Sequence, residues 1–272
     1  MVRHYLNFNI KKKHKGSIIL IGNFDGLHLG HQKLFRLAQL FKKKNNLKIG
    51  VVNFDPMPKM FFNKKLKNFR LTNVNQKIKL LNNLKVDFVI TKKFDKKFSK
   101  MKALNFITQI LNKKLRSKFI FVSNNFRFGN KREGDVNLLK KYEKSLNYKV
   151  IKPEPLIKNK KIVSSSSIRN LLEKGFLNKA NNLLNRNWTI QGIVKKGRQV
   201  GKKIGFPTCN IDIQDYVLAK PGVYAVKVLR KNSTKLLKGI ANLGYRPTFN
   251  QKKILLEVHL FNFSGNLYNK LL

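Results

Sequence analysis

From about residue 17 to residue 184, the chain alternates short apolar runs with longer segments of helical periodicity. The runs have the length of buried strands, and the segments between them repeat apolar residues every three or four positions. Strands that alternate with helices predict a doubly wound parallel sheet. The expected strands are 17–21, 48–54, 88–90 and 119–122, and the expected helices are 32–43, 75–84 and 102–115.

The pattern changes after Trp188. Short strand-like runs follow, separated by glycine, proline and asparagine turns, which predicts a small antiparallel β-barrel. A helical segment at 167–184 closes the first part. We therefore expect an α/β protein with two domains, residues 1–185 and residues 186–272. The expected strands of the second domain are 189–194, 222–228, 238–242 and 254–261.

The sequence contains neither a recognisable membrane span nor a secretory signal. Its apolar runs are far shorter than the ~20 residues of a membrane helix. The N-terminus lacks the succession of basic, apolar and small residues that marks a signal peptide. Cys209 is the only cysteine, so the chain can form no internal disulfide. These features predict a cytoplasmic protein without a membrane partner.

The chain is strongly basic, with 59 Lys and Arg residues against 12 Asp and Glu residues and a formal net charge of +47. Such a charge invites a nucleic-acid interpretation. The lysines are spread over every segment together with many asparagines, which indicates a compositional bias and not one basic face. We expect no specific nucleic-acid partner; a barrel that binds RNA is the alternative from another functional class.

At residues 18–32, a strand leads through a glycine-rich loop into a helix, with the sequence IILIGNFDGLHLGHQ. Proteins of the α/β class bind phosphates at such places, because glycine permits close approach and free N–H groups face the anion. His28 and His31 would lie at the helix opening, where charge accumulates during nucleotidyl transfer. A metal site is the weaker alternative, since Asp25 is the only carboxylate nearby. The candidate nucleotide-binding residues are Gly22, Phe24, Asp25, Gly26 and Gly30.

The chain resembles the bacterial bifunctional riboflavin kinase/FMN adenylyltransferases over almost its whole length. After the histidine motif, the family's second block is present as NFDPMP at 53–58, with Met57 where a histidine is usual. The next block is RLT at 70–72. The block SNNFRFG at 123–129 has Ser123 and Asn125 in place of a glycine and an acid. The resemblance implies that Asn125 contacts the flavin, with hydrogen-bonding capacity but no charge.

A serine run at 164–167 is followed by Ile168 and Arg169 and resembles the family's Ser-Ser-Thr-x-Ile-Arg signature. Alone, a serine run before a helix is usually an N-cap. The resemblance implies a second phosphate-binding element. Ser164, Ser165 and Ser166 would hold the β- and γ-phosphates, and Arg169 would neutralise the departing pyrophosphate.

Residues 197–210 place three glycines at a spacing of four before a Pro-Thr-x-Asn turn. Alone, this segment favours a surface loop between strands. Thr208 and Asn210 nevertheless offer the hard oxygen ligands that Mg²⁺ prefers. Riboflavin kinases carry a Gly-Phe-Pro-Thr-Ala-Asn block here, with Cys209 replacing its alanine in this chain. The candidate nucleotide-binding residues are Gly197, Gly201, Gly205 and Pro207.

Glu257 lies within the apolar run 254–261. A carboxylate in a half-buried strand is costly unless it has a partner or a function. A structural ion pair with a lysine would explain it. The resemblance implies instead that Glu257 is the general base that takes the proton of the ribityl 5′-hydroxyl during phosphoryl transfer. It also implies that Asn242 and Arg246, in the block NLGYRPT at 242–248, lie near the flavin.

The resemblance therefore implies an FAD-synthesising enzyme with an N-terminal adenylyltransferase domain and a C-terminal kinase barrel. Its substrates would be riboflavin, FMN and ATP, with Mg²⁺ as cofactor. An aminoacyl-tRNA synthetase fragment would share the histidine motif, but no anticodon-binding segment follows. Family members continue with a further strand and a helix beyond the point where this sequence stops, so we expect an incomplete barrel and a weaker kinase activity.

Overall fold

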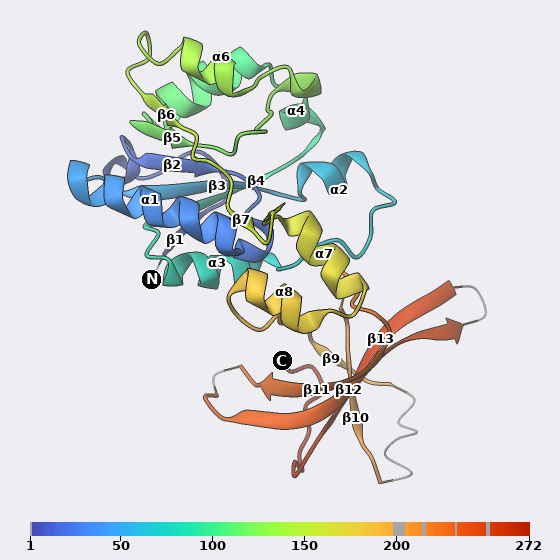
Figure 1. Cartoon of the computed structure of the whole chain (residues 1–272). Helices are drawn as coiled ribbons and strands as arrows, with labels where there is room; N and C mark the ends of the chain where they lie inside the picture. Colours follow the sequence, from blue (N-terminus) through green and yellow to red (C-terminus); the bar gives the residue numbers. More distant parts are fainter. Residues whose placement is uncertain (1, 198–204, 214–215, 232, 249–250) are drawn as a thin grey trace. The chain divides into compact units, whose positions relative to one another are not determined.

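The computed structural model describes residues 2–197, 205–213, 216–231, 233–248 and 251–272. They form two compact units (Figure 1). No helix in these residues is long and apolar enough to cross a membrane. The first unit comprises Met1–Lys67, Val74–Ser167 and Leu183–Asn185, and the second comprises Asn68–Asn73, Ile168–Asn182 and Arg186–Leu272.

The first unit is built on a six-stranded sheet in the order β1-β4-β3-β2-β5-β6, in which every pairing is parallel (Figure 1). This confirms the predicted doubly wound parallel sheet. The four predicted strands correspond to β2–β5, and the sequence missed the two edge strands. The strands are β1 (Arg3–Tyr5), β2 (Ile18–Ile21), β3 (Ile49–Asp55), β4 (Phe88–Lys93), β5 (Phe119–Phe121) and β6 (Lys149–Ile151).

Successive residues of the central strand β2 pack into two different cores, as expected when side chains alternate across a sheet. Ile18 and Leu20 contact the core on which α1 (Leu29–Asn45) and α3 (Val74–Asn83) pack. Ile19 and Ile21 contact the opposite core, formed with the π-helix η3 (Phe106–Lys114) and α6 (Val136–Lys141). The sheet is thus covered on both faces.

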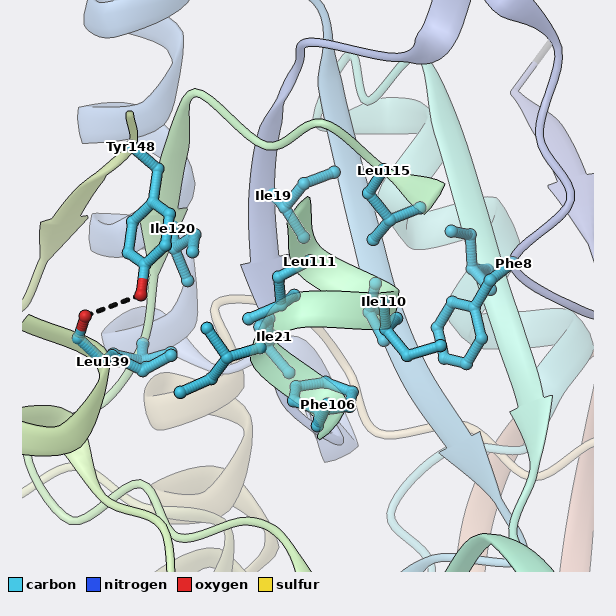
Figure 2. Close-up of a cluster of buried hydrophobic side chains, with 14 of the residues drawn as sticks. Phe8, Ile19, Ile21, Phe106, Ile110, Leu111, Leu115, Ile120, Leu139 and Tyr148 are labelled. Carbon is cyan, nitrogen blue, oxygen red and sulfur yellow. Dashed lines mark hydrogen bonds between the residues drawn. The ribbon is translucent and has the colours of Figure 1, made fainter. Parts of the chain in front are cut away.

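Figure 2 shows part of the second of these cores, where Ile19, Ile21 and Ile120 of the sheet lie beside Leu111 of the π-helix. The Tyr148 hydroxyl is buried there and donates a hydrogen bond to the Leu139 carbonyl at 2.6 Å. Burial raises the pKa of this phenol, so Tyr148 acts as a neutral donor.

The remaining helices and strands up to Leu184 are short. The predicted helix at 102–115 is present as α5 followed by the π-helix, and the predicted helix at 167–184 is two helices. The break between the two helices is a Schellman motif, in which the Phe176 N–H donates to the Leu171 carbonyl and Gly175 has a φ of 82°.

The short elements of this part of the chain are η1 (Lys12–His14), η2 (Asp25–Leu27), α2 (Pro58–Phe62), α4 (Lys96–Ser99), α5 (Ala103–Asn105), η4 (Asn130–Arg132), β7 (Ile157–Lys158), β8 (Lys161–Ile162), α7 (Ser165–Glu173) and α8 (Leu177–Leu184).

The second unit contains an antiparallel five-stranded sheet in the order β11-β12-β13-β10-β9. One face packs on an apolar core that includes Val194, Ile211 and Val258. In the residues that the structure describes, β11 and β9 are the edges of the sheet, and residues 269–272 pair with 192–194 beside β9. The strands are β9 (Val194–Lys195), β10 (Thr208–Ile211), β11 (Gly222–Leu229), β12 (Leu236–Thr248) and β13 (Gln251–Leu260).

Candidate functional site

The predicted phosphate loop lies at the carboxyl end of β2. The order of the strands reverses between β2 and β5, and ligands of doubly wound sheets bind at the carboxyl ends of the strands at such a switch point. Asn125, which follows β5, is exposed and accepts a hydrogen bond from the Ser123 hydroxyl at 3.0 Å. The fold therefore places the loops after β2 and β5 at the same edge of the sheet.

The loop itself is tightly turned. Gly22 continues the strand pairing by donating from its N–H to the Val52 carbonyl at 3.1 Å. Phe24 and Asp25 are buried, and Phe24, Gly26 and Leu27 have φ values of 46°, 78° and 42°. The left-handed conformation at two residues with side chains is uncommon and is concentrated at functional turns.

The two histidines meet at the start of α1. The His28 ring caps the helix: its Nδ1 accepts a hydrogen bond from the His31 N–H at 3.4 Å. The rings stack, with centroids 3.7 Å apart and planes 22° apart. A Cβ on Gly30 would lie 3.2 Å from both the His28 ring and the Val163 carbonyl oxygen, so this position needs glycine. Because Nδ1 is an acceptor, the neutral His28 ring carries its proton on Nε2 and can donate it to a ligand.

The pKa of His31 lies well below its ordinary value of 6.5. Burial is the main cause, and the neighbouring His28 and Lys77 lower the pKa further. The ring also meets the buried Phe24 edge to face, with centroids 5.2 Å apart. His31 is therefore neutral near pH 7, so its ring can form hydrogen bonds but does not act as a cation.

This lowered pKa predicts how stability changes with pH. In the unfolded chain His31 takes up a proton as the pH falls through 6.5, whereas the folded chain resists that proton. The unfolded state then binds more protons, so the free energy of unfolding decreases as the pH falls. We expect His31→Gln to show a smaller decrease than the parent between about pH 7.5 and 5.5 in urea unfolding. Equal decreases in the two proteins would contradict this assignment.

Three buried polar atoms around this loop have no hydrogen-bond partner: Asn23 Oδ1, His31 Nδ1 and Asn53 Nδ2. Asn23 follows β2, and Asn53 lies near the carboxyl end of the adjacent β3. A buried polar group without a partner costs about 1–3 kcal/mol, and such groups require an explanation. A bound polar ligand at this edge of the sheet would satisfy all three.

The serine run lies beside the same loop. The Ser165 hydroxyl donates to the Asp25 carbonyl at 2.9 Å, and Ser166 is exposed. Ser164 and Ser167 cap α7 reciprocally, since the Ser164 hydroxyl accepts from the Ser167 N–H at 3.1 Å and the Ser167 hydroxyl accepts from the Ser164 N–H at 3.2 Å. The run thus combines the ordinary capping role with contact to the phosphate loop.

A cavity of about 290 Å³ lies within the first unit, and its wall is largely aromatic. Three basic residues, Arg127, Lys131 and Arg132, are also part of the lining. Lys131 and Arg132 both have positive φ, 49° and 63°. The aromatic residues of the lining are Phe54, Phe62, Phe94, Phe98, Phe106, Phe126 and Phe128.

In the second unit, Asn210, Glu257 and Asn242 form a row across β10, β13 and β12. The Asn210 amide donates to Glu257 Oε1 at 3.2 Å and accepts from the Gly197 N–H at 3.2 Å, in the orientation that satisfies both ends. A side chain on Gly197 would collide with this amide. The register therefore brings a predicted metal ligand, the predicted base and a predicted flavin contact together.

The loop before β10 ends at Thr208, two residues before Asn210 on the same strand. Thr208 is paired with His259, and the His259 Nδ1 lies 2.9 Å from the Pro207 carbonyl oxygen. Phe206 is exposed and meets the His259 ring edge to face, with centroids 5.5 Å apart. Gly205 has a φ of 82°.

Comparison with known proteins gives two family matches. Residues 10–167 match the FAD synthetase family and residues 184–272 match the riboflavin kinase family. The chain is 43% identical to a bifunctional riboflavin kinase/FMN adenylyltransferase of Buchnera aphidicola subsp. Schizaphis graminum, over 96% of this chain and 85% of that protein. The chain belongs to the bifunctional riboflavin kinase/FMN adenylyltransferase family.

Other relatives support this family assignment. The proteins of the same description from Haemophilus influenzae and Escherichia coli K12 are 39% and 38% identical, over 97% and 94% of this chain and 85% and 82% of theirs. Among solved structures, one described as a macrolide-efflux protein from Streptococcus pneumoniae matches with a TM-score of 0.85 and 26% identity. The match covers 99% of this chain and 88% of the chain in that solved structure.

For three of the expected site residues, the described structure does not bear on the expected role. Arg169 is grouped with the second unit, where its Nε donates to the Phe69 carbonyl at 2.7 Å and its guanidinium lies 3.6 Å from the Phe69 ring centroid. Gly201 lies outside the described residues. Arg246 is in β12 opposite Lys253, and its side chain is not described. Their roles stay predictions.

The sequence analysis missed the aromatic cavity and the two asparagines Asn23 and Asn53. The signal for the asparagines was available, because both lie at the carboxyl ends of expected buried strands, where parallel sheets place ligand-binding groups. The cavity had no such signal. Its phenylalanines come from separate segments between β3 and the loop after β5, and only the fold brings them together.

Proposed function

We propose that the second unit phosphorylates riboflavin to FMN and that the first unit transfers AMP from ATP to FMN, giving FAD and pyrophosphate. The observation that supports the second step best is the stacked His28 and His31 pair beside three buried polar atoms without partners. The row of Asn210, Glu257 and Asn242 supports the first. Functionally, we place the boundary between the two domains at residue 185, next to the start of the riboflavin kinase match at residue 184.

For adenylyl transfer, we assign His28 and His31 to the phosphates of ATP. His28 presents Nε2–H, and His31 has a buried Nδ1 for which the protein supplies no partner. Gly22, Gly26 and Gly30 allow close approach of the backbone, and the exposed Ser166 at the start of α7 offers a hydroxyl and N–H groups. An oxygen of the FMN phosphate attacks the α-phosphorus, so no protein nucleophile is required.

We assign the aromatic cavity to the isoalloxazine ring. Its volume of about 290 Å³ and seven phenylalanines suit a flat apolar ring. The basic residues Arg127, Lys131 and Arg132 suit the phosphate of FMN. Asn125 lies two residues before Arg127 on the same loop, which supports its proposed contact with the flavin.

Phe62 provides the mildest test of this cavity because its side chain is 69% exposed and contributes little to the core. Stacking of a planar base on an aromatic side chain is worth about 1–3 kcal/mol, so we expect Phe62→Ala to raise the KM for FMN by about 5- to 150-fold. The KM for riboflavin in the kinase reaction should not change. Leu40→Ala, an exposed apolar residue of α1, is the control. A parental KM for FMN in Phe62→Ala would remove Phe62 from the flavin site.

For the kinase reaction, Glu257 is the proposed base and Asn210 positions it through their hydrogen bond. Gly197, Gly205 and Pro207 frame the loop proposed to hold ATP. Thr208 and Asn210 would hold Mg²⁺, together with phosphate oxygens of ATP. Thr208 and Asn210 fit Mg²⁺, because both side chains offer hard oxygen ligands. The Asn210 Oδ1 accepts a hydrogen bond from the Gly197 N–H and has a second lone pair for the metal. When bound, Mg²⁺ would neutralise charge on the transferred phosphoryl group.

We also propose a cytoplasmic enzyme without a specific nucleic-acid partner. One experiment tests the function as a whole. The purified chain is incubated with riboflavin and Mg-ATP, and the flavins are separated by chromatography. FMN and then FAD are expected. Formation of neither would refute the proposal, and formation of FAD only from supplied FMN would refute the kinase half.

A further inference from the structure

His259 lies on β13 two residues after Glu257, so the two side chains point to the same face of the sheet in the second unit. The strand register pairs Glu257 with Asn210 and His259 with Thr208. The face that carries the proposed base and the proposed metal ligands therefore also carries an imidazole, to which the proposed kinase reaction gives no role.

The His259 ring is held by a hydrogen bond and by two aromatic neighbours. Its Nδ1 lies 2.9 Å from the Pro207 carbonyl oxygen. A carbonyl oxygen can only accept, so the imidazole carries a proton on Nδ1 and donates it. Phe206 and Phe261 meet the ring edge to face, with centroids 5.5 and 5.8 Å from that of the imidazole. These contacts hold the imidazole in the orientation that its hydrogen bond requires.

The carbonyl that His259 binds lies immediately before the start of β10 at Thr208. Pro207 has no N–H with which to extend the antiparallel pairing beyond that point. The His259 side chain thus supplies a hydrogen bond where the strand pairing ends. Because a peptide unit is planar, fixing the Pro207 carbonyl oxygen also fixes the nitrogen and Cα of Thr208. This limits where the Thr208 hydroxyl can lie.

We infer that His259 is a positioning residue of the kinase reaction, which holds the peptide between Pro207 and Thr208 so that the Thr208 hydroxyl is in place for the metal ion of Mg-ATP. This inference rests on the proposed function, which assigns Thr208 to Mg²⁺. In this role His259 acts only through the loop, and it transfers no proton. Groups that orient metal ligands are a general feature of metal sites, and loss of one commonly lowers metal affinity about 10–100-fold.

The test compares His259→Leu with His259→Asn. Leucine and asparagine branch at the same carbon and have similar shapes, but only the asparagine amide can donate from near the position of the imidazole Nδ1. We expect His259→Leu to raise the KM for Mg-ATP in riboflavin phosphorylation by about 10–100-fold, with the KM for riboflavin unchanged and kcat near the parental value at saturating Mg-ATP. His259→Asn should restore the KM for Mg-ATP close to that of the parent. Both variants should adenylylate FMN at the parental rate.

A second measurement uses the parent chain and does not depend on turnover. The ¹⁵N NMR signals of the His259 ring, assigned by their loss in His259→Asn, should show Nδ1 protonated when the ring is neutral. Mn-ADP, in which Mn²⁺ replaces Mg²⁺, should broaden these signals, because a metal ion at Thr208 lies close to the ring.

Three results would overturn the inference: ring signals that Mn-ADP leaves sharp, equal values of the KM for Mg-ATP in His259→Leu and His259→Asn, or a parental KM in His259→Leu. A lower thermal midpoint together with that parental KM would mean that the contact only stabilises the loop. A parent chain that forms no FMN would instead refute the proposed function, so the two failures are distinguishable.

Discussion

Replacing His31 by alanine is expected to lower the rate of FAD formation from FMN by about 10²–10³-fold, while riboflavin phosphorylation continues at the parental rate. The reason is the geometry at the start of α1. His31 stacks on His28 and lies against the buried Phe24, so its position is fixed before the ligand binds. Loss of a preorganised group raises the barrier directly, because no solvent molecule takes its place in the same orientation.

The measurement uses one preparation with saturating Mg-ATP and follows both products by chromatography. His4→Ala is the matched control: it also removes a partly buried histidine of the first unit, one on the edge strand β1, which β4 and β3 separate from β2. It should leave FAD formation near the parental rate. Unchanged FAD synthesis in His31→Ala would remove His31 from the mechanism, whereas loss of both activities would indicate a folding defect.

The parallel sheet of the first unit could be predicted because its central strands are buried on both faces. Such strands are continuous apolar runs, and β2 and β5 stand out in the sequence for that reason. The edge strands β1 and β6 were missed. Each has three residues and a burial pattern that includes exposed side chains, so neither produces an apolar run.

The candidate sites likewise combine features that the sequence reveals with features that only the fold reveals. The histidine motif is local, so the loop, the helix start and the stacking of the rings follow from residues close together in the sequence. Contact between Ser165 and Asp25 joins residues 140 positions apart, and no local pattern reveals it. The serine run also shows a limit of motif reasoning: Ser164 was expected to hold phosphate, yet its hydroxyl is engaged in capping α7.

In the second unit, the decisive relation is the register between strands. Asn210 and Glu257 are neighbours only because β10 pairs with β13 in one particular register; a shift by one residue would turn the two side chains to opposite faces. The sequence suggests each residue separately through its motif. It does not reveal that the amide of Asn210 holds the carboxylate of Glu257, with Gly197 on the other side of the amide.

This contact leads to the second large effect, which is expected in Glu257→Gln. We expect FMN formation from riboflavin to fall by about 10²–10⁴-fold, the usual contribution of a general base. FAD formation from supplied FMN should persist. Glutamine keeps the volume of glutamate, and its Oε1 can still accept the hydrogen bond from Asn210, so the row across the sheet survives. The amide cannot take the proton of the ribityl hydroxyl, and this is the function that the substitution tests.

Asp212→Asn is the matched control, because it neutralises another acid, two residues beyond Asn210. This variant should phosphorylate riboflavin close to the parental rate, since Asp212 pairs with Lys195 and does not face Glu257 in the strand register. The comparison also separates chemistry from charge: both variants raise the net charge of this basic chain by one, so a loss common to both would reflect electrostatics and not a base. Parental FMN formation in Glu257→Gln would mean that Glu257 holds Asn210 in place and takes no proton.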